Sequence, residues 1–170
     1  RAPLQVGAEL YGHSGVASDI EIVKLMLATL KQVGINKTYI DIGHIGIFRT
    51  LSADSSLSLI QQEKVFEALQ RKAKDELKCL HKEWGITNAV SKALVEIVDL
   101  NGDITVLDEA KKLLAKISPD SLQYLDEIKA LTESIAGQSE VSINVDLAEL
   151  RGYHYHTGMI YTAFVPGEGE

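Results

Sequence analysis

One stretch constrains this chain more than any other, a polar and aromatic segment at residues 151–158 that leads directly into the apolar residues 159–165. The segment reads Arg151-Gly152-Tyr153-His154-Tyr155-His156-Thr157-Gly158. The apolar residues after it are typical of a β-strand. Side chains of an extended chain alternate between two faces, so the two histidines would lie on one face and Arg151 with the tyrosines on the other. A local break in that alternation would bring both faces into one pocket.

The residues alone leave four interpretations of this segment open. It can be a half-buried aromatic strand whose polar atoms find partners inside the protein. A metal site would use His154 and His156, but two ligands are too few and no Cys or carboxylate is close in sequence, so we expect no metal ion. Acid–base catalysis by one histidine lacks a visible nucleophile and an orienting carboxylate. A small-ligand pocket would use Arg151 for an anion and tyrosine hydroxyls for a polar ring.

The first residues show a second pattern. Residues 4–11 alternate apolar and polar side chains, which predicts a half-buried strand. Gln5 and Glu9 would lie four residues apart on one face, with Gly7 between them leaving room for a ligand. For an isolated strand, a polar row that faces solvent is the commoner interpretation.

Apolar spacing of three and four residues predicts an amphipathic helix over residues 20–33. Ser18 and Glu21 have the spacing of a capping box at its start, and Gly34 is expected to end it.

The next element is a predicted strand at residues 38–43, followed by a short helix at 45–51. His44 lies between them, where a capping or packing role is expected rather than a catalytic one. A further alternating segment, residues 141–146, predicts another strand.

The middle of the chain has helical periodicity. The predicted helices span residues 58–83, 87–98, 105–117 and 122–135, with Gly85 after the first, a turn at Asn101-Gly102 and Ser118-Pro119 starting the last. Lys and Arg gather between Arg71 and Lys82, but acidic residues are interleaved with them. The mixed signs favour a solvated helix surface over an RNA-contacting face.

The composition restricts the class of protein. The net charge is −7 and the sequence pI is about 5.2, which argues against broad binding to a nucleic-acid backbone. Cys79 is the lone cysteine, so no intrachain disulfide can form, and a reducing cytoplasm is expected. No apolar run is long enough to span a membrane.

Two motifs carry a resemblance to a known family. Residues 151–158 resemble the histidine-specific Arg-Gly-Leu-Asp-Tyr-Tyr-Thr-Gly motif of histidyl-tRNA synthetases, and residues 5–12 resemble the Gln-x-Gly-x-Glu-x-Phe-Gly end of their motif 2. The Tyr-His-Thr-Gly variant and the following Phe-x-Pro-Gly are closer to the synthetase-like regulatory subunits of ATP phosphoribosyltransferase. The close matches cover residues 1–51 and 138–167, and the middle matches only in helical character.

The resemblance implies an α+β fold with an antiparallel sheet of the class II aminoacyl-tRNA synthetase type. Residues 1–51 and 138–170 would form part of the synthetase-like domain, and residues 52–137 a helical insertion. Motif 1, the first half of motif 2 and motif 3 have no counterpart here, so we expect the chain to be part of a longer protein.

The resemblance also implies a function. We expect a non-catalytic regulatory subunit without cofactors, which supports the first step of histidine biosynthesis in a hetero-oligomer with the catalytic subunit and mediates feedback inhibition by L-histidine. Self-association of the full-length protein is expected, and tRNA binding is not. The site residues that carry over form a histidine-like pocket of Gln5, Glu9, Arg151, Tyr155 and His156, with none assigned to catalysis.

Two alternatives belong to other classes. One is a fragment of an active histidyl-tRNA synthetase, which the Arg151 and Gln5/Glu9 matches allow. His154 in place of Asp and His156 in place of the second Tyr count against it. The other is a binding module that uses the helical middle on RNA or on a partner protein, which a salt-dependent affinity for tRNA would support in the RNA case.

Overall fold

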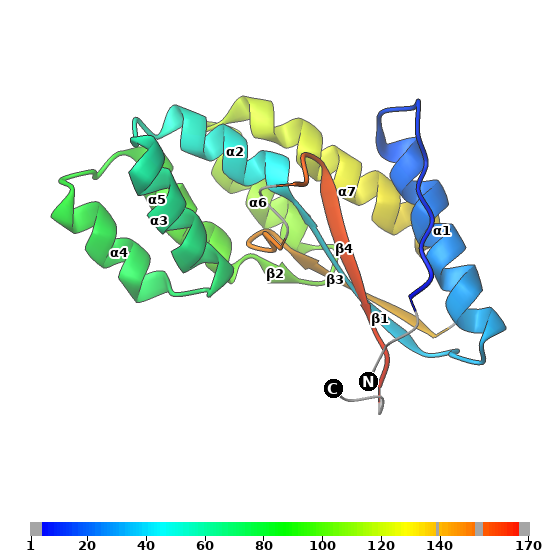
Figure 1. Ribbon diagram of the computed structural model, residues 1–170. Helices are drawn as coiled ribbons and strands as arrows, with labels where there is room; N and C mark the ends of the chain where they lie inside the picture. The colour runs from blue at the N-terminus through cyan, green and yellow to red at the C-terminus, as the bar shows by residue number, and fades with distance from the viewer. Residues whose placement is uncertain (1–4, 139, 152–154, 167–170) are drawn as a thin grey trace.

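A computed structural model describes residues 5–138, 140–151 and 155–166. A four-stranded sheet forms its centre, with α1 and α7 packed beside it and the remaining helices extending to one side (Figure 1). The strands are β1 (Thr38–His44), β2 (Asn101–Gly102), β3 (Val141–Asp146) and β4 (Met159–Phe164), in the spatial order β2-β3-β1-β4. The predicted strands at residues 38–43, 141–146 and 159–165 are therefore confirmed.

The sheet is mixed. β1 pairs with β3 in parallel, with Ile40 opposite Ile143, whereas β1–β4 and β2–β3 are antiparallel. A parallel pair needs a long crossover, and the helices between residues 45 and 135 supply it. The predicted α+β class is confirmed, but within this chain the sheet is not wholly antiparallel.

The first helix, α1 (Val16–Gln32), matches its prediction except at its start. Gly34 has φ +87° and the Ile35 N–H donates to the Leu30 carbonyl, so the helix ends as the glycine predicts. The predicted capping box is wrong. Gly15 occupies the N-cap position without a side-chain cap, and the Ser18 hydroxyl lies 2.6 Å from Nδ1 of His13 instead.

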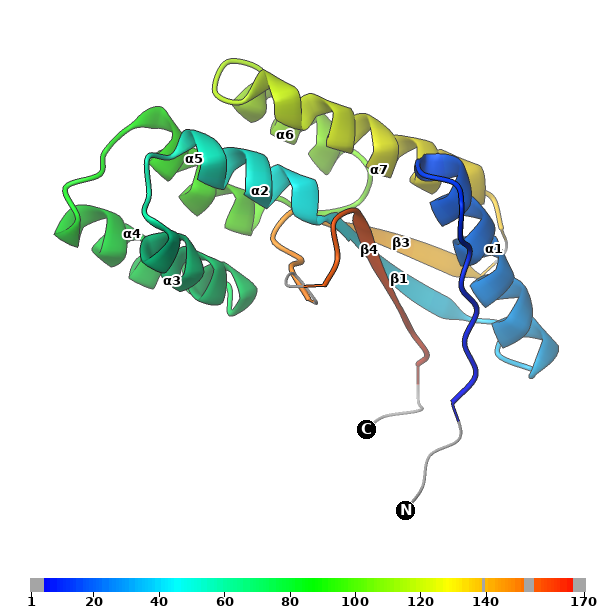
Figure 2. The ribbon, with the colours of Figure 1, turned by 45° about the horizontal axis from the view of Figure 1, so that its top comes forward.

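The predicted strand at residues 4–11 is also wrong in its described part. Residues 5–14 have no regular secondary structure, and Val6 and Tyr11 are almost fully exposed. The segment runs along α1 (Figures 1 and 2). Val6 and Ala8 line a groove there with Leu25 and other side chains of that helix. Alternation alone cannot make a strand, because a strand needs a neighbour for its backbone hydrogen bonds.

The remaining helices follow the predicted order. They are α2 (Ile45–Asp54), α3 (Leu59–Gln70), α4 (Lys74–Glu83), α5 (Ala89–Glu96), α6 (Val106–Leu114) and α7 (Leu122–Ile135), with 3₁₀ turns at Ile97–Asp99 and Pro119–Ser121. Asn101-Gly102, predicted as a turn, is the short strand β2. β2 pairs with β3 and forms the edge of the described sheet opposite β4.

The single helix predicted for residues 58–83 is two helices. Lys72 adopts φ +54°, and the Ala73 N–H donates back to the Ala68 carbonyl. Leu69 of α3 and Leu77 of α4, on either side of this reversal, both lie in the core. Helical periodicity continues through the break, so the sequence pattern does not reveal it.

The core is continuous from α1 through the sheet to the outer helices, and it includes Val23, Ile40, Phe48, Leu69 and Leu94. α7 packs against α1 and β1. The division into a synthetase-like domain and an insertion at residues 52–137 stays a prediction. None of the described helices is both long and apolar enough to cross a membrane.

Candidate functional site

The part of the motif region that the structure describes is built on a close approach between β1 and the turn after β3. A Cβ at Gly43 would lie 2.8 Å from the Asp146 carbonyl oxygen and 2.8 Å from the Glu149 Cβ. Such contacts are shorter than packed atoms allow, so only glycine fits at this point of β1. The turn at residues 147–150 is buried and delivers Arg151 to the end of the sheet.

Arg151 is held by one carboxylate of its own segment. Its Nε donates to Glu149 Oε1 at 2.9 Å and its Nη2 to Oε2 at 2.7 Å, a two-pronged contact. The Arg151 backbone N–H also donates to Oε1 at 2.9 Å. The Glu149 side chain is only 10% exposed, whereas half of the Arg151 side chain faces solvent. Both oxygens of this carboxylate are therefore occupied by a single residue.

The surrounding charges strengthen this pair. Burial raises the pKa of Glu149, but the hydrogen bonds and charge of Arg151, with a contribution from Lys72, outweigh burial and leave that pKa below its usual value. Hydrogen bonding to Glu149, aided by the charges of Asp41 and Asp146, raises the pKa of Arg151. Arg151 therefore lies in an acidic surrounding that leaves little of its charge uncompensated.

The nearby acidic residues have partners of their own. Asp146 forms an ion pair with Lys72 Nζ at 2.5 Å, and its other oxygen accepts from the Ala148 N–H. Asn144 Nδ2 donates to Asp41 at 3.1 Å across the β1–β3 pair. The polar side chains at this end of the sheet therefore pair mainly with one another, which leaves few hydrogen-bond donors for a ligand.

Tyr155 and His156 lie on the outside of this network. The Tyr155 side chain is 91% exposed, and His156 is exposed as well. Arg49 of α2 holds the segment through its Nη2, which donates to the His156 carbonyl at 3.0 Å. Tyr153 and His154 lie outside the described residues. Of the predicted pocket, the structure brings Arg151, Tyr155 and His156 to one end of the sheet.

Gln5 and Glu9 lie elsewhere. Both are exposed in the segment beside α1, and Glu9 accepts a hydrogen bond from the Tyr11 hydroxyl. Within the described part of the chain, no hydrogen bond or ion pair connects Gln5 or Glu9 with Arg151, Tyr155 or His156. Figures 1 and 2 place the two segments on opposite sides of β4.

A partly buried polar cluster that the sequence pattern did not reveal surrounds His44. As predicted, this residue caps a helix, because the Gly46 N–H donates to its Nδ1 at 3.0 Å. The proton is therefore on Nε2, which donates to Glu127 at 3.0 Å. Tyr124 stacks on the imidazole with ring centroids 4.4 Å apart. Helical spacing placed Tyr124 and Glu127 on α7 but gave no sign that they meet β1.

Burial determines the electrostatics of this cluster. It lowers the pKa of His44, and the charge of Glu127 opposes that shift. Burial also raises the pKa of Asp19 and of Tyr161, and the charge of Glu127 adds to the rise at Asp19. No group of three or more His, Cys, Asp or Glu side chains among the described residues is placed to hold a metal ion.

Comparison with known proteins accounts for this architecture. The sequence profile described as Histidyl-tRNA synthetase matches residues 1–170, the whole of the chain. The chain belongs to the histidyl-tRNA synthetase family. The resemblance drawn from residues 5–12 and 151–158 is therefore confirmed at the level of the family, and it extends through the helical middle that the motifs did not cover.

Curated relatives within this family carry a more specific name. The chain is 43% identical to an ATP phosphoribosyltransferase regulatory subunit of Thioalkalivibrio sulfidiphilus and 43% identical to one of Methylococcus capsulatus, over 100% and 99% of its length. A regulatory subunit of Pseudomonas putida is 40% identical. The chain spans 42–43% of the length of these three relatives.

Solved structures share the fold. A Bacillus halodurans protein described as an ATP phosphoribosyltransferase regulatory subunit/histidyl-tRNA synthetase matches 94% of this chain and 42% of its own, with TM-score 0.77 at 22% identity. An ATP phosphoribosyl transferase (HisG:HisZ) complex from Thermotoga maritima has TM-score 0.71 over 92% of this chain and 54% of the matched chain, at 16% identity. The histidyl-tRNA synthetase of Nostoc also has TM-score 0.71, over 92% of this chain and 38% of its own, at 19% identity. At these identities the likeness shows the class II synthetase-like fold alone.

Proposed function

We propose that this chain is the synthetase-like part of a regulatory subunit of ATP phosphoribosyltransferase. It supports the catalytic subunit in the first step of histidine biosynthesis without itself catalysing a reaction. The identity of 40–43% to curated proteins of that name, along the whole chain, supports the proposal. Cys79 as the single cysteine and the described helices, none suited to crossing a membrane, are compatible with a cytoplasmic protein.

The observation that carries the non-catalytic role is the Arg151–Glu149 pair. In the synthetase resemblance, Arg151 would contact a reacting carboxylate and phosphate. Here both oxygens of the nearly buried Glu149 occupy its guanidinium, and Asp41 and Asp146 add negative charge nearby. A transition state that develops negative charge would have to compete with this carboxylate, which opposes catalysis through Arg151.

Histidine sensing is the second part of the proposal. L-histidine would bind in the longer protein between the segments that hold Gln5 and Glu9 and those that hold Arg151, Tyr155 and His156. Glu9 suits an ammonium or an imidazole N–H, and Gln5 can both donate and accept. For histidine to inhibit the catalytic partner, it must bind one state of the complex more tightly than another.

The direct test is reconstitution of the full-length protein with the catalytic subunit. We expect the two to form a stable hetero-oligomer and the phosphoribosyl transfer rate to depend on the regulatory chain. Glu9→Ala should weaken inhibition by histidine while assembly stays intact. A transfer rate and a histidine response that are the same with and without this protein would contradict the proposal.

ATP–pyrophosphate exchange separates the regulator from the synthetase. We expect no histidine-dependent exchange above background from the full-length protein. Exchange that requires histidine and is lost in Arg151→Gln would instead establish an active histidyl-tRNA synthetase.

A further inference from the structure

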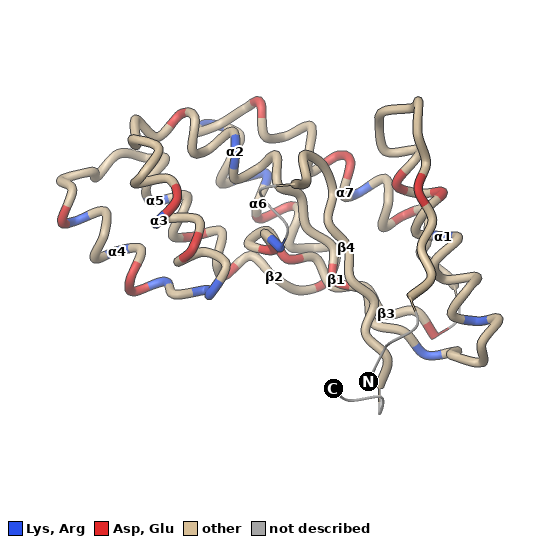
Figure 3. Tube along the Cα trace, in the orientation of Figure 1, with Lys and Arg blue, Asp and Glu red and all other residues tan. Residues whose placement is uncertain are grey.

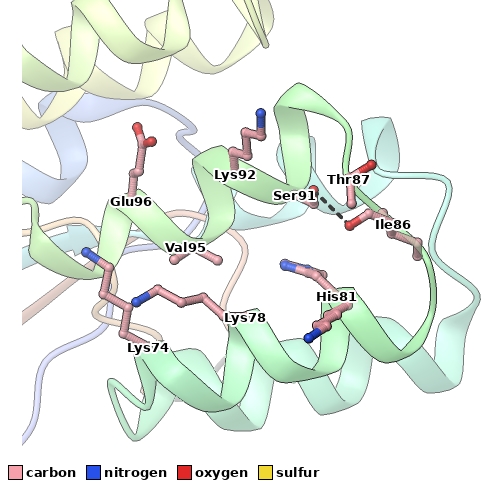
Figure 4. Close-up of a pocket in the computed structure, with 10 residues that line it drawn as sticks. Lys74, Lys78, His81, Ile86, Thr87, Ser91, Lys92, Val95 and Glu96 are labelled. Carbon is pink, nitrogen blue, oxygen red and sulfur yellow. Dashed lines mark hydrogen bonds between the residues drawn. The ribbon is translucent and has the colours of Figure 1, made fainter.

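A cleft of about 450 Å³ lies between α4 and α5, in the helical region away from α1 (Figures 1 and 4). Its lining combines basic side chains, most of them from α4, with apolar ones. The basic side chains are Lys74, Lys78, Lys82 and Lys92, and the others are His81, Ile86, Thr87, Ser91, Val95 and Glu96. The volume is in the range of small-molecule sites. None of these residues belongs to the motif region.

The cleft is positively charged in an acidic protein. The lining contains four lysines and a single glutamate, although the chain has a net charge of −7. Lys74 and Lys78 are one helical turn apart on α4, an arrangement of like charges that destabilises a helix. Figure 4 shows both side chains extending toward the same end of the cleft, whereas the Lys92 side chain is directed away from α4. Figure 3 shows that acidic residues alternate with the lysines along α4.

The carboxylates that pair with these two lysines are solvent-exposed. Lys78 contacts Asp75 at 2.9 Å, and the Asp75 side chain is 93% exposed. Lys74 contacts Asp99, whose side chain is 62% exposed. Exposed ion pairs contribute little free energy, so an incoming anion can replace either carboxylate.

A second, independent observation comes from His81. Its spacing from Lys74 and Lys78 places it on the same face of α4, and it lines the cleft while only 5% exposed. Its Nε2 is buried and has no hydrogen-bond partner among the described residues. Burial lowers the pKa of this imidazole, and no carboxylate offsets that effect. A buried nitrogen without a hydrogen bond destabilises the folded protein, and a polar ligand atom in the adjoining cleft could supply the missing hydrogen bond.

The opposite wall suits an apolar body. Half-buried Ile86 and Val95 border the cleft, and both pack against the core. Ser91 is occupied, because its hydroxyl donates to the Asn88 carbonyl at 2.9 Å. The cleft therefore offers cations and an apolar surface, with few free polar groups to position a sugar or a peptide backbone.

We propose that the cleft binds a small organic phosphate, with the phosphate between Lys74 and Lys78 and the ring or apolar body against Val95 and Ile86, toward His81. The site does not depend on the proposed regulatory function, and histidine is not its ligand. Inorganic phosphate alone would use only the cationic half. An RNA strand would bind through its phosphates but would not need the apolar wall.

Calorimetric titration of the folded chain with AMP, inorganic phosphate and adenosine tests the proposal. We expect saturable binding with affinity decreasing from AMP to phosphate to adenosine, because only AMP uses both the basic and the apolar part of the cleft. In a second readout, AMP should shift the NMR signals of the His81 ring protons, because the ring of the ligand would lie on the side of the cleft where His81 is. Equal affinity for AMP and adenosine would overturn the anionic half of the site.

The matched variants carry equal changes of charge. Lys74→Gln with Lys78→Gln should weaken AMP binding at least tenfold, since a hydrogen bond to a charged group is worth about this factor or more. Lys111→Gln with Lys112→Gln, on the exposed face of α6, should leave AMP binding unchanged. Equal affinities of both double variants for AMP would overturn the proposal. So would binding of an RNA oligonucleotide without any binding of AMP.

Discussion

Arg151 at the end of the sheet and Lys78 in the helical region are both paired with carboxylates, but the two carboxylates differ in burial. The Glu149 side chain is 10% exposed and makes three hydrogen bonds to Arg151, two from the side chain and one from the backbone. Asp75 is almost fully exposed and makes one contact to Lys78. A cation fixed by a buried partner contributes to the fold, whereas one with an exposed partner is available to a ligand.

The largest loss of stability should come from filling the space at Gly43, against which the turn that carries Glu149 and Arg151 packs. Gly43→Ala places a Cβ against the Asp146 carbonyl and the Glu149 Cβ, and neither can move without shifting the turn. We expect a loss of about 3 kcal/mol in the free energy of unfolding, measured by urea denaturation. Gly7→Ala is the control, because nothing lies within 4 Å of its Cβ. Equal stability of the two variants would disprove the close approach.

Removing one charge from each pair tests the comparison directly. Glu149→Gln should cost about 1–2 kcal/mol, a figure below that of a fully buried pair because Arg151 is half exposed. Asp75→Asn should change stability by less than about 0.5 kcal/mol. A double-mutant cycle with Arg151→Gln isolates the coupling. If Asp75→Asn costs as much as Glu149→Gln, burial of the carboxylate does not decide the strength of the pair.

Acid should destabilise both regions through their histidines. Burial lowers the pKa of His44 and of His81, so in the folded protein each binds its proton at a lower pH than in the unfolded chain. Stability should be full above about pH 6.5 and fall as the pH drops below it, by up to about 1.4 kcal/mol per pH unit for each histidine that titrates only in the unfolded chain.

Chemical denaturation between pH 5 and 8 measures this slope. His44→Asn keeps a capping side chain and should flatten the slope, and His81→Asn should flatten it independently. If neither substitution alters the slope, these imidazoles are not the groups that titrate.

The smallest effect should be that of the cleft lysines on stability. Lys78→Gln removes one exposed pair and one like-charge contact, so the free energy of unfolding should change by less than about 0.5 kcal/mol in either direction. Thermal unfolding checks this value. A larger loss would mean that Lys78 serves the fold and would remove it from the set of available cations.

The spacing of apolar residues and the residue types at turns predicted most of the helices and strands. The strands that became β1, β3 and β4 have apolar residues on buried positions, and Gly34 ended α1 where expected. The break at Lys72 was missed because a non-glycine residue in the left-handed region has no signature in an apolar pattern. The strand at residues 4–11 was predicted from alternation, but no partner strand is paired with its described residues.

The site was less predictable than the fold. Motif resemblance placed Arg151, Tyr155 and His156 in one segment, and the structure keeps them at one end of the sheet. The pairing of Glu149 with Arg151 depends on the buried turn that packs over Gly43. The residue types in the sequence do not specify that turn. The role of His44 as a cap was predictable from its place after a strand, but its contact with Glu127 joins residues 83 positions apart.

The reversal at Lys72 also determines how the helical region is held. The same residue that separates α3 from α4 extends its side chain to Asp146 at the end of β3. The helices α3–α5 are therefore joined to the sheet by this ion pair in addition to the shared hydrophobic core and the chain connections. Lys72→Gly would relax the left-handed backbone and remove the ion pair at the same time, leaving the core alone to fix the helices against the sheet.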